Sequence, residues 1–474
     1  MTQIHDLTVI ELAAAIRARE LSPVEATDYY LRRIGDLNAQ VGAFFTVTAE
    51  LAGDQARAAE KAVTRAGEPG ELPPLTGVPI PIKDLNMVAG VRQTFGSAVY
   101  EDNIAIQDDH AVAAIRAAGA VITGKTATPE FGLPCYTETT IGPPARTPWD
   151  LSRSAGGSSG GAGAAVSAGL APAAQGSDGG GSIRIPSSLC GLYGIKPTRG
   201  RISRGPLVPD LAGLSVDGPI SRTVSDAALL LDVMTGNRPG DMHTQPPLPA
   251  GETFLGYAAR DPGRLRIARS LRHPVDGGAV HPDCVAAYED ASRLLSELGH
   301  DVEDVELPFG PDVVPMFETL WYAMATLAPV DPAREDRLLP LTRYLRGRGQ
   351  ATSAGELIFA QAYLQIMVRS ALVTLAAYDA VLTPTLASPP VPVGYFEEVE
   401  PPENFERQKR FTPFTALYNV TGQPSVSLPL YWTAAGLPVG VMLAGRMGEE
   451  GTLISLSAQL EAARPWKDRH PPLW

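Results

Sequence analysis

A run of three glycines followed by a serine is the segment of this 474-residue chain best suited to chemistry. It reads GSDGGGSIR over residues 176–184, with Ser182 directly after Gly179, Gly180 and Gly181. Glycine amides have no side chain to obstruct them, so such a run can direct several N–H groups at one developing negative charge. Each such donor stabilises an acyl-transfer transition state by roughly 3–4 kcal/mol. The segment therefore predicts an oxyanion hole beside a nucleophilic Ser182. A flexible linker is the alternative, but linkers seldom continue into apolar segments such as IRIP and SSLCGLYGIKP.

A serine hydroxyl becomes a good nucleophile only when a base takes its proton. Between residues 76 and 224 the only histidine is His110, and the helix-like AVAAIRAAG after it favours a helix cap or a surface position. Lys83, one of six lysines, lies in the apolar context VPIPIKD. Desolvation can lower a lysine pKa from about 10.4 by up to 3–5 units, toward a neutral amine that acts as a base near pH 7. The residues alone leave an alternative for Lys83 equally favoured: its amine reaches solvent, or it pairs with Asp84. They do not by themselves favour the role of base over this alternative.

Two other motifs match patterns for different chemistry. Residues 119–126 satisfy the phosphate-loop pattern G-x-x-x-x-G-K-[ST], but a helix-like segment precedes them and the β-branched AVIT fills the loop, so a helix-to-strand junction is favoured. Residues 156–160 satisfy G-x-S-x-G, the nucleophile elbow of α/β-hydrolases. No apolar strand precedes them, and the later histidines lie in polar, loop-like stretches. Neither nucleotide binding nor a histidine triad is favoured.

Several blocks closely resemble the amidase signature family. They include LTGVPIPIKD, AGGSSGGAGAAVSAG, GSDGGGSIRIPSSLCGLYGIKPTRGRIS, DGPISRTVSDAALLL, YDAVLTPT and FTALYNVTGQPSVSLPL. The resemblance covers nearly the whole chain, and the 24 residues from Ser158 to Ser182 agree with the family spacing. It implies a Ser-cisSer-Lys triad in which Ser182 is the nucleophile, Ser158 relays protons from a cis peptide bond, and Lys83 is the general base.

The resemblance also assigns roles to neighbouring residues. It implies that the oxyanion hole is formed by the backbone donors of Gly179, Gly180, Gly181 and Ser182. Ser159 is expected to support the triad by hydrogen bonding, and Gly132 to lie in a substrate-side loop with its carbonyl facing the triad. Asp178 and Arg184 match family positions and are interpreted as buried braces of the loop. Ala127 departs from the family, where asparagine is frequent, but removes no catalytic group.

Helical and strand-like segments alternate along the chain, which predicts an α/β architecture. Ser22 and Pro23 are expected to be the N-cap and the first residue of a second helix near the N-terminus. The acidic, proline-rich stretch 389–405 is expected to be a loop. The resemblance implies the amidase signature fold, in which a large mixed central β-sheet is covered on both faces by α-helices. We expect a single domain over residues 1–474. It would consist of an N-terminal helical segment (1–70) packed on the core, a catalytic core (76–235), and the rest of the sheet with the substrate-pocket helices (240–474).

The composition of the chain narrows the range of binding partners that we expect. The formal charge is −13 and the pI about 5.1, without a cluster of Lys and Arg, which argues against nucleic acid or an anionic membrane as partner. The N-terminus does not resemble a signal peptide, no window holds 18 uninterrupted apolar residues, and the cytoplasm is expected. Three cysteines show no C-x-x-C spacing and predict neither a disulfide framework nor a zinc site. No cofactor or metal is expected, and the protein should be a monomer or homodimer.

The expected function is hydrolysis of amides through an acyl-enzyme on Ser182, with esters as easier substrates and carbamates as further candidates. An apolar helix is expected to form part of the pocket and to favour apolar or aromatic substrates, although a plain core helix fits its residues equally well: Met316, Phe317, Leu320, Trp321 and Met324. The late blocks look most like bacterial acylamidases, including aryl acylamidases and nylon-oligomer or urethane hydrolases. The alternative is the glutaminase-like A subunit of a tRNA-dependent amidotransferase, which the acidic segment EEVEPPE disfavours.

Overall fold

The computed structural model describes residues 3–67, 69–209, 212–275 and 277–474. An eight-stranded mixed sheet forms its centre, and two short strand pairings at one end are parallel while the others are antiparallel. Across the sheet the strands run in the order β4 (Ala173–Asp178), β6 (Val216–Ser221), β5 (Tyr193–Lys196), β10 (Ser425–Trp432), β11 (Pro438–Gly445), β9 (Ala380–Pro384), β7 (Arg266–Arg269) and β8 (Asp301–Asp304). The predicted large mixed sheet is confirmed.

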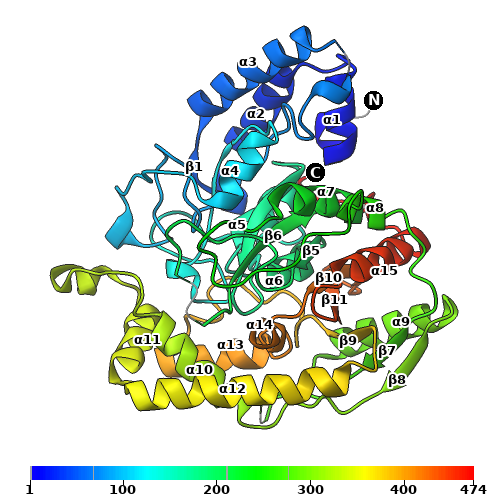
Figure 1. Ribbon diagram of the computed structural model, residues 1–474. Coiled ribbons are helices and arrows are strands. Elements are labelled where there is room, and N and C mark those ends of the chain that lie inside the picture. The colour runs from blue at the N-terminus through cyan, green and yellow to red at the C-terminus, as the bar shows by residue number, and fades with distance from the viewer. Residues whose placement is uncertain (1–2, 68, 210–211, 276) are drawn as a thin grey trace.

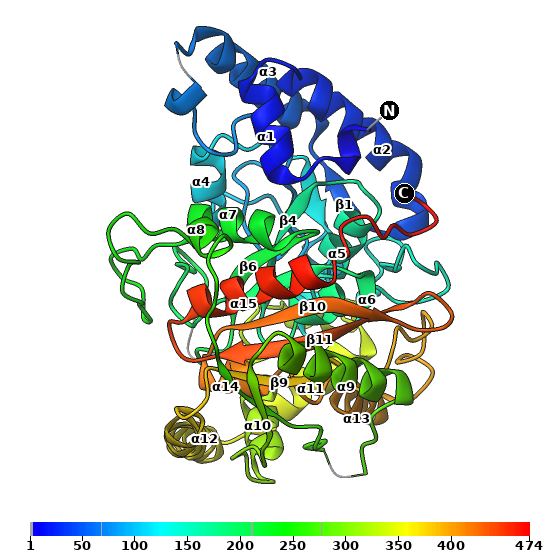
Figure 2. The ribbon, with the colours of Figure 1, turned by 90° about the vertical axis from the view of Figure 1, so that its right-hand side faces the viewer.

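Helices cover both faces of this sheet, as Figures 1 and 2 show. In order along the chain they are α1 (Val9–Arg17), α2 (Pro23–Val41), α3 (Ala49–Arg65), α4 (His110–Ala117), α5 (Gly160–Ser167), α6 (Arg184–Cys190), α7 (Val224–Met234), α8 (Phe254–Tyr257), α9 (Pro282–Glu297), α10 (Val313–Met324), α11 (Pro340–Ala351), α12 (Ala354–Leu375), α13 (Pro401–Phe411), α14 (Leu417–Thr421) and α15 (Glu450–Ala463).

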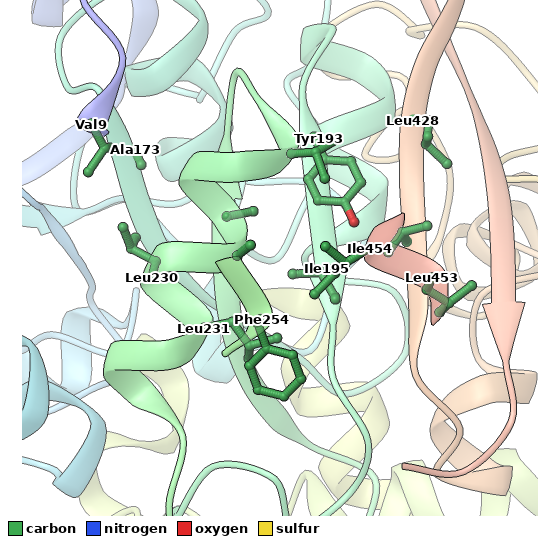
Figure 3. Close-up of a cluster of buried hydrophobic side chains, with 14 of the residues drawn as sticks. Val9, Ala173, Tyr193, Ile195, Leu230, Leu231, Phe254, Leu428, Leu453 and Ile454 are labelled. Carbon is green, nitrogen blue, oxygen red and sulfur yellow. The ribbon is translucent and has the colours of Figure 1, made fainter. Parts of the chain in front are cut away.

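Strand β11 illustrates why helices must cover both faces of the sheet. Its residues alternate, with Val441 and Leu443 in one hydrophobic cluster and Met442 and Ala444 in another. Because successive side chains of a strand point to opposite faces, a strand that is apolar throughout must be covered twice. Figure 3 shows part of the first cluster, where side chains from α7 and α15 meet those of β5 and β10.

The N-terminal helices begin where the sequence predicts. The Ser22 hydroxyl accepts hydrogen bonds from the amides of Val24 and Glu25, and Pro23 is the first helical residue, so α2 has a complete N-cap. The apolar stripe of α1 is buried, and Val9 belongs to the same cluster as α7. The segment that matched the phosphate-loop pattern is a helix-to-strand junction between α4 and β3, as predicted.

One loop prediction is wrong in part. The acidic, proline-rich stretch 389–405 was expected to be loop throughout, yet α13 begins at Pro401. Two prolines at the helix start supply the fixed φ angle that suits a first turn, where no amide partner is needed, and Glu403 adds a favourable charge there.

Helix α12 is long and apolar. It has 22 residues with mean hydropathy 1.4, which by length and composition could cross a membrane, and only 17% of its best window is buried. Its outward side chains include Ile358, Phe359, Ile366 and Val373. The sequence has no 18 uninterrupted apolar residues, because Gln365 and Arg369 interrupt this helix, but the inference that no helix is able to span a membrane is contradicted by the length and composition of α12.

A second, three-stranded sheet positions the residues at Lys83. Its strands are β1 (Phe44–Val47), β3 (Gly124–Thr126) and β2 (Ile82–Lys83), with β3 in the middle and β2 parallel to it. Lys125 on β3 forms a fully buried ion pair with Asp84, at 2.9 Å from Nζ to Oδ1. The Asp84 carboxylate also accepts hydrogen bonds from the amide and the hydroxyl of Thr94. This network anchors the chain immediately after Lys83.

Removing one partner of that pair leaves the other charge buried without compensation. We therefore expect Lys125→Met to lower the free energy of unfolding by about 3–5 kcal/mol. As a matched control, Arg57→Met breaks an exposed ion pair with Asp54 and should cost no more than about 1 kcal/mol. Urea unfolding followed by circular dichroism measures both, and equal effects of the two substitutions would contradict the assignment.

Candidate active site

Lys83 and Ser158 meet at the end of the short strand β2. The Lys83 Nζ donates to Ser158 Oγ at 2.8 Å and to the backbone oxygen of Ser177 at 3.2 Å. The Gln175 side chain accepts a hydrogen bond from the Lys83 amide at 3.0 Å and so fixes the strand against β4. Two residues that lie 75 positions apart in the sequence are thereby brought into contact, as the resemblance implied.

Lys83 has no exposed surface. Its pKa is lowered to about 7, chiefly by burial and to a smaller extent by the nearby charge of Arg204, while Asp178 and Asp217 oppose the shift. Neither alternative for this residue holds, because the amine does not reach solvent and Asp84 is paired with Lys125 instead. At neutral pH a large fraction of this amine is therefore uncharged and has a free lone pair.

Ser158 follows a cis peptide bond between Gly157 and Ser158. Its neighbour Ser159 ties the two serine segments together, since its amide donates to the backbone oxygen of Ser182 at 3.2 Å. The Ser159 hydroxyl donates to the Ser177 oxygen at 3.1 Å, the same atom that receives a bond from Lys83. Ser159 thus lies where a supporting residue is expected, at the junction of the segments that carry Lys83, Ser158 and Ser182.

The glycine loop is wrapped around the carboxylate of Asp178. This carboxylate forms a two-point ion pair with Arg184, with both distances 2.9 Å and both residues fully buried. Burial opposes ionisation of Asp178, but the charge and the hydrogen bonds of Arg184 keep its pKa well below the ordinary value. Asn419 donates to the same carboxylate at 2.9 Å. Asp178 and Arg184 are therefore buried braces of the loop, as expected from the sequence.

The Gly181 amide has a different role from the one expected. It donates to Asp178 Oδ1 at 2.7 Å, so it holds the loop and is not open toward a substrate. The residue has φ +136°, and an added Cβ would lie 2.4 Å from the Thr415 hydroxyl, which explains why glycine is needed there. The expectation that Gly181 is an oxyanion donor is corrected, and the candidate donors are the amides of Gly179, Gly180 and Ser182.

Ser182 opens into an apolar cavity of about 750 Å³. Its side chain makes no hydrogen bond to the described residues, which leaves the hydroxyl oriented by the loop alone. The cavity walls include Gly180 of the loop and the stacked rings of Phe317 and Trp321, whose centroids are 5.3 Å apart. The space beside Ser182 is therefore mostly apolar.

Ser158 opens into a second cavity of about 1730 Å³, which extends to solvent. Gly132 lines it and has φ +70°, and a Cβ on this residue would lie 3.3 Å from Ser158 Oγ. Gly132 is therefore beside the Ser158 hydroxyl, at the position expected of a substrate-side loop. Leu133 and Trp321 line both cavities, so the two spaces adjoin at the reaction centre.

The apolar helix α10 contributes to these walls less uniformly than expected. Phe317 and Trp321 line the Ser182 cavity, and Met324 lines the Ser158 cavity. Leu320 faces a separate hollow, and Met316 packs at the edge of a hydrophobic cluster. The helix is therefore partly a pocket wall and partly core.

Several residues near the site were not predicted from the sequence. Asn419 links Asp178 to Arg184, Thr415 donates to the Gly180 oxygen at 2.6 Å, and Arg204 lies in the second cavity. The segment FTALYNVTG was noticed as a block that resembles the family, but only the fold reveals that its polar side chains brace a loop 235 residues earlier.

Known proteins resemble this chain over its full length. The family model described as Amidase matches residues 25–454. The 6-aminohexanoate-cyclic-dimer hydrolase of Paenarthrobacter ureafaciens is 34% identical, with 97% of this chain and 95% of that protein covered. A solved structure of 6-aminohexanoate cyclic dimer hydrolase with substrate superposes with a TM-score of 0.91 at 31% identity over 99% of both chains. A bacterial aryl acylamidase of the amidase signature family gives a TM-score of 0.86 at 26% identity over 98% of both chains.

The chain belongs to the amidase signature family. It is an amide-hydrolysing enzyme with the mixed α/β fold of that family.

The lowered pKa of Lys83 predicts a particular pH profile. Only the uncharged amine can accept a proton, so kcat/KM for an amide should rise about tenfold per pH unit below pH 7 and level off above it. Lys83→Ala should lower activity severely at pH 7, less at high pH, and remove the inflection. The exposed Lys61→Ala is the matched control and should keep the wild-type profile. Wild-type activity that does not change between pH 5 and 8, or a Lys83→Ala enzyme of full activity, would refute the assignment of the base.

Proposed function

We propose that this protein is a serine hydrolase that cleaves amides of apolar or aromatic acids through an acyl-enzyme on Ser182, with Lys83 as general base and Ser158 as proton relay. The observation that carries the proposal is the contact of a fully buried lysine amine with the Ser158 hydroxyl, beside a braced glycine loop that ends in Ser182. Gly179, Gly180 and Ser182 are the proposed oxyanion donors, and Ser159 and Gly132 the proposed supporting residues.

In the first half-reaction the Ser182 oxygen attacks the carbonyl carbon of the amide. Its proton passes to Ser158, and the proton of Ser158 passes to the lone pair of Lys83. The carbonyl oxygen becomes an oxyanion that the loop amides stabilise. As the C–N bond breaks, Ser158 gives a proton to the leaving nitrogen and regains one from Lys83. The amine departs and the acyl group remains as an ester on Ser182.

In the second half-reaction water takes the place of the amine. Ser158 and Lys83 accept its proton by the same route while its oxygen attacks the ester carbon. Collapse of the second tetrahedral intermediate breaks the bond to Ser182, whose oxygen is reprotonated through Ser158. The carboxylic acid product leaves, and every group returns to its starting protonation state.

The apolar cavity at Ser182 supports acyl groups with aromatic or alkyl chains. Esters should react faster than the corresponding amides because an ester carbonyl is less stabilised by resonance and because, unlike the amide nitrogen, the ester oxygen can leave without prior protonation. Carbamates fit the same mechanism. Relatives named for a cyclic amide dimer and for aryl acylamides support this substrate range.

The enzyme is further proposed to act as one domain, in the cytoplasm, as a monomer or homodimer, on a small molecule and without a cofactor or nucleic acid. The contacts between α1 and α7 and the unbroken eight-stranded sheet support a single domain. The competing function, an amidotransferase A subunit, would leave the purified chain nearly inert on a p-nitroanilide, whereas the proposed hydrolase works alone.

A substrate panel tests the proposal directly. The purified chain should hydrolyse an anilide, an ester and a carbamate with an apolar acyl group faster than a small primary amide. Ser182→Ala should abolish turnover of all of them, and intact-protein mass spectrometry should detect an acyl adduct that peptide mapping assigns to Ser182. Undiminished turnover by Ser182→Ala, or an adduct on another residue, would overturn the mechanism.

A further inference from the structure

Arg204 stands out in the cavity that contains Ser158. The walls of this cavity are otherwise apolar or neutral and include Met87, Phe95 and Leu327. Of the described residues that line it, only Arg204 carries a formal charge. Its cation is close enough to the active site to lower the pKa of Lys83.

Among the described residues, the guanidinium of Arg204 has no partner that explains its position. Its Nε and Nη1 atoms are buried and make no hydrogen bond within the described residues. No hydrogen bond or ion pair joins Arg204 to the nearby carboxylates among the described residues: Asp217 Oδ1 accepts from Asn86 and Gln175, Asp109 Oδ2 accepts from the Met87 amide, and Asp109 Oδ1 has no partner.

Among the described residues, arginines that are more fully buried than Arg204 are bonded. Arg184 donates to Asp178, Asn419 and a backbone oxygen, and Arg201 donates to Glu450 and to the backbone oxygens of Pro246 and Gly448. Arg222 has two unbonded nitrogens, but its Nη2 donates to two backbone oxygens and its cation lies over Trp474. A guanidinium that only supports the fold has such partners, because leaving buried donors unbonded costs free energy.

We propose that Arg204 binds a carboxylate of the substrate, so that the cavity accepts amides whose leaving amine carries an acidic group. A carboxylate can accept a charge-assisted N–H bond from the part of the guanidinium that lines the cavity, and the surrounding apolar walls strengthen that pairing. An aromatic or alkyl spacer between the amide nitrogen and the carboxylate would occupy the apolar part of the cavity.

The two serines indicate which half of the substrate lies there. This assignment rests on the proposed function, in which Ser158 gives a proton to the leaving nitrogen while Ser182 keeps the acyl group. Ser158 lines the Arg204 cavity, and Ser182 lines the other. The amine half therefore extends toward Arg204 and the acyl half toward Phe317.

Two chromogenic substrates that differ by one carboxylate test this inference. These are hexanoyl 4-nitroanilide and hexanoyl 3-carboxy-4-nitroanilide, compared by the ratio of their kcat/KM values. Arg204→Gln should lower the ratio of carboxylated to neutral substrate about 30-fold, mainly through KM, as expected for a lost charged hydrogen-bonded pair. Any effect of the substitution on the pKa of Lys83 acts on both substrates and cancels in the ratio. Arg204→Lys should restore part of the ratio, and Arg57→Gln, on an exposed helix, should leave it unchanged.

A second measurement uses the wild-type enzyme alone and guards against a variant that fails to fold. The carboxylated amine product, 5-amino-2-nitrobenzoate, should inhibit at least tenfold more strongly than 4-nitroaniline, and added salt should weaken that inhibition. Equal inhibition by the two amines, or a ratio that Arg204→Gln leaves unchanged, would overturn the assignment of Arg204. Neither result would touch the proposed hydrolase, which fails only if wild-type protein cleaves neither anilide or Ser182→Ala cleaves both.

Discussion

The site depends on keeping the amine of Lys83 out of water. A lysine with its ordinary pKa is almost fully charged at neutral pH and can only donate hydrogen bonds. In this protein Ile82, Val78 and Ile80 line the approach of the chain and are themselves fully buried, so the amine lies in a medium that penalises charge. The two oxygens that surround it, from Ser158 and Ser177, are neutral and do not compensate for the lost hydration. Burial therefore favours the uncharged amine that the proposed base requires.

Three buried lysines show how much the partner matters. Lys125 and Lys196 are as buried as Lys83, and burial lowers the pKa of each. Lys125, however, is paired with Asp84, whose charge favours the ammonium form, and Lys196 donates to the backbone oxygen of Pro197. Only Lys83 bonds to a hydroxyl that faces a substrate cavity. Because Asp84 is paired with Lys125, its carboxylate does not stabilise the charged form of Lys83, the residue before it.

The sequence was informative where the governing interactions are local. Helix starts such as Ser22-Pro23 and the junction at Gly124 depend on neighbouring residues, and both were predicted. The sequence alone could not decide whether Lys83 pairs with Asp84. The residue that does pair with Asp84 is Lys125, which lies 41 residues further along the chain. The triad residues came from the resemblance, since their contacts join segments on different sheets. The use of the Gly181 amide by Asp178 depends on the exact path of the loop, which spacing alone does not specify.

In the proposed mechanism the two cavities separate binding of the acyl half of the substrate from binding of its amine half. A single pocket would have to bind both halves. Trp321 reaches both spaces, and behind it the loop places Gly180 in one and Gly179 in the other. In the proposed mechanism the carbonyl oxygen accepts hydrogen bonds from these two amides, so the substrate would extend into both spaces past Leu133 and Trp321. Apolar contacts in the Ser182 cavity act equally on the amide and on the acyl-enzyme, because the acyl group stays there in both. Contacts in the Ser158 cavity disappear when the amine leaves. Selection for the amine half can therefore raise the rate of acylation without slowing deacylation.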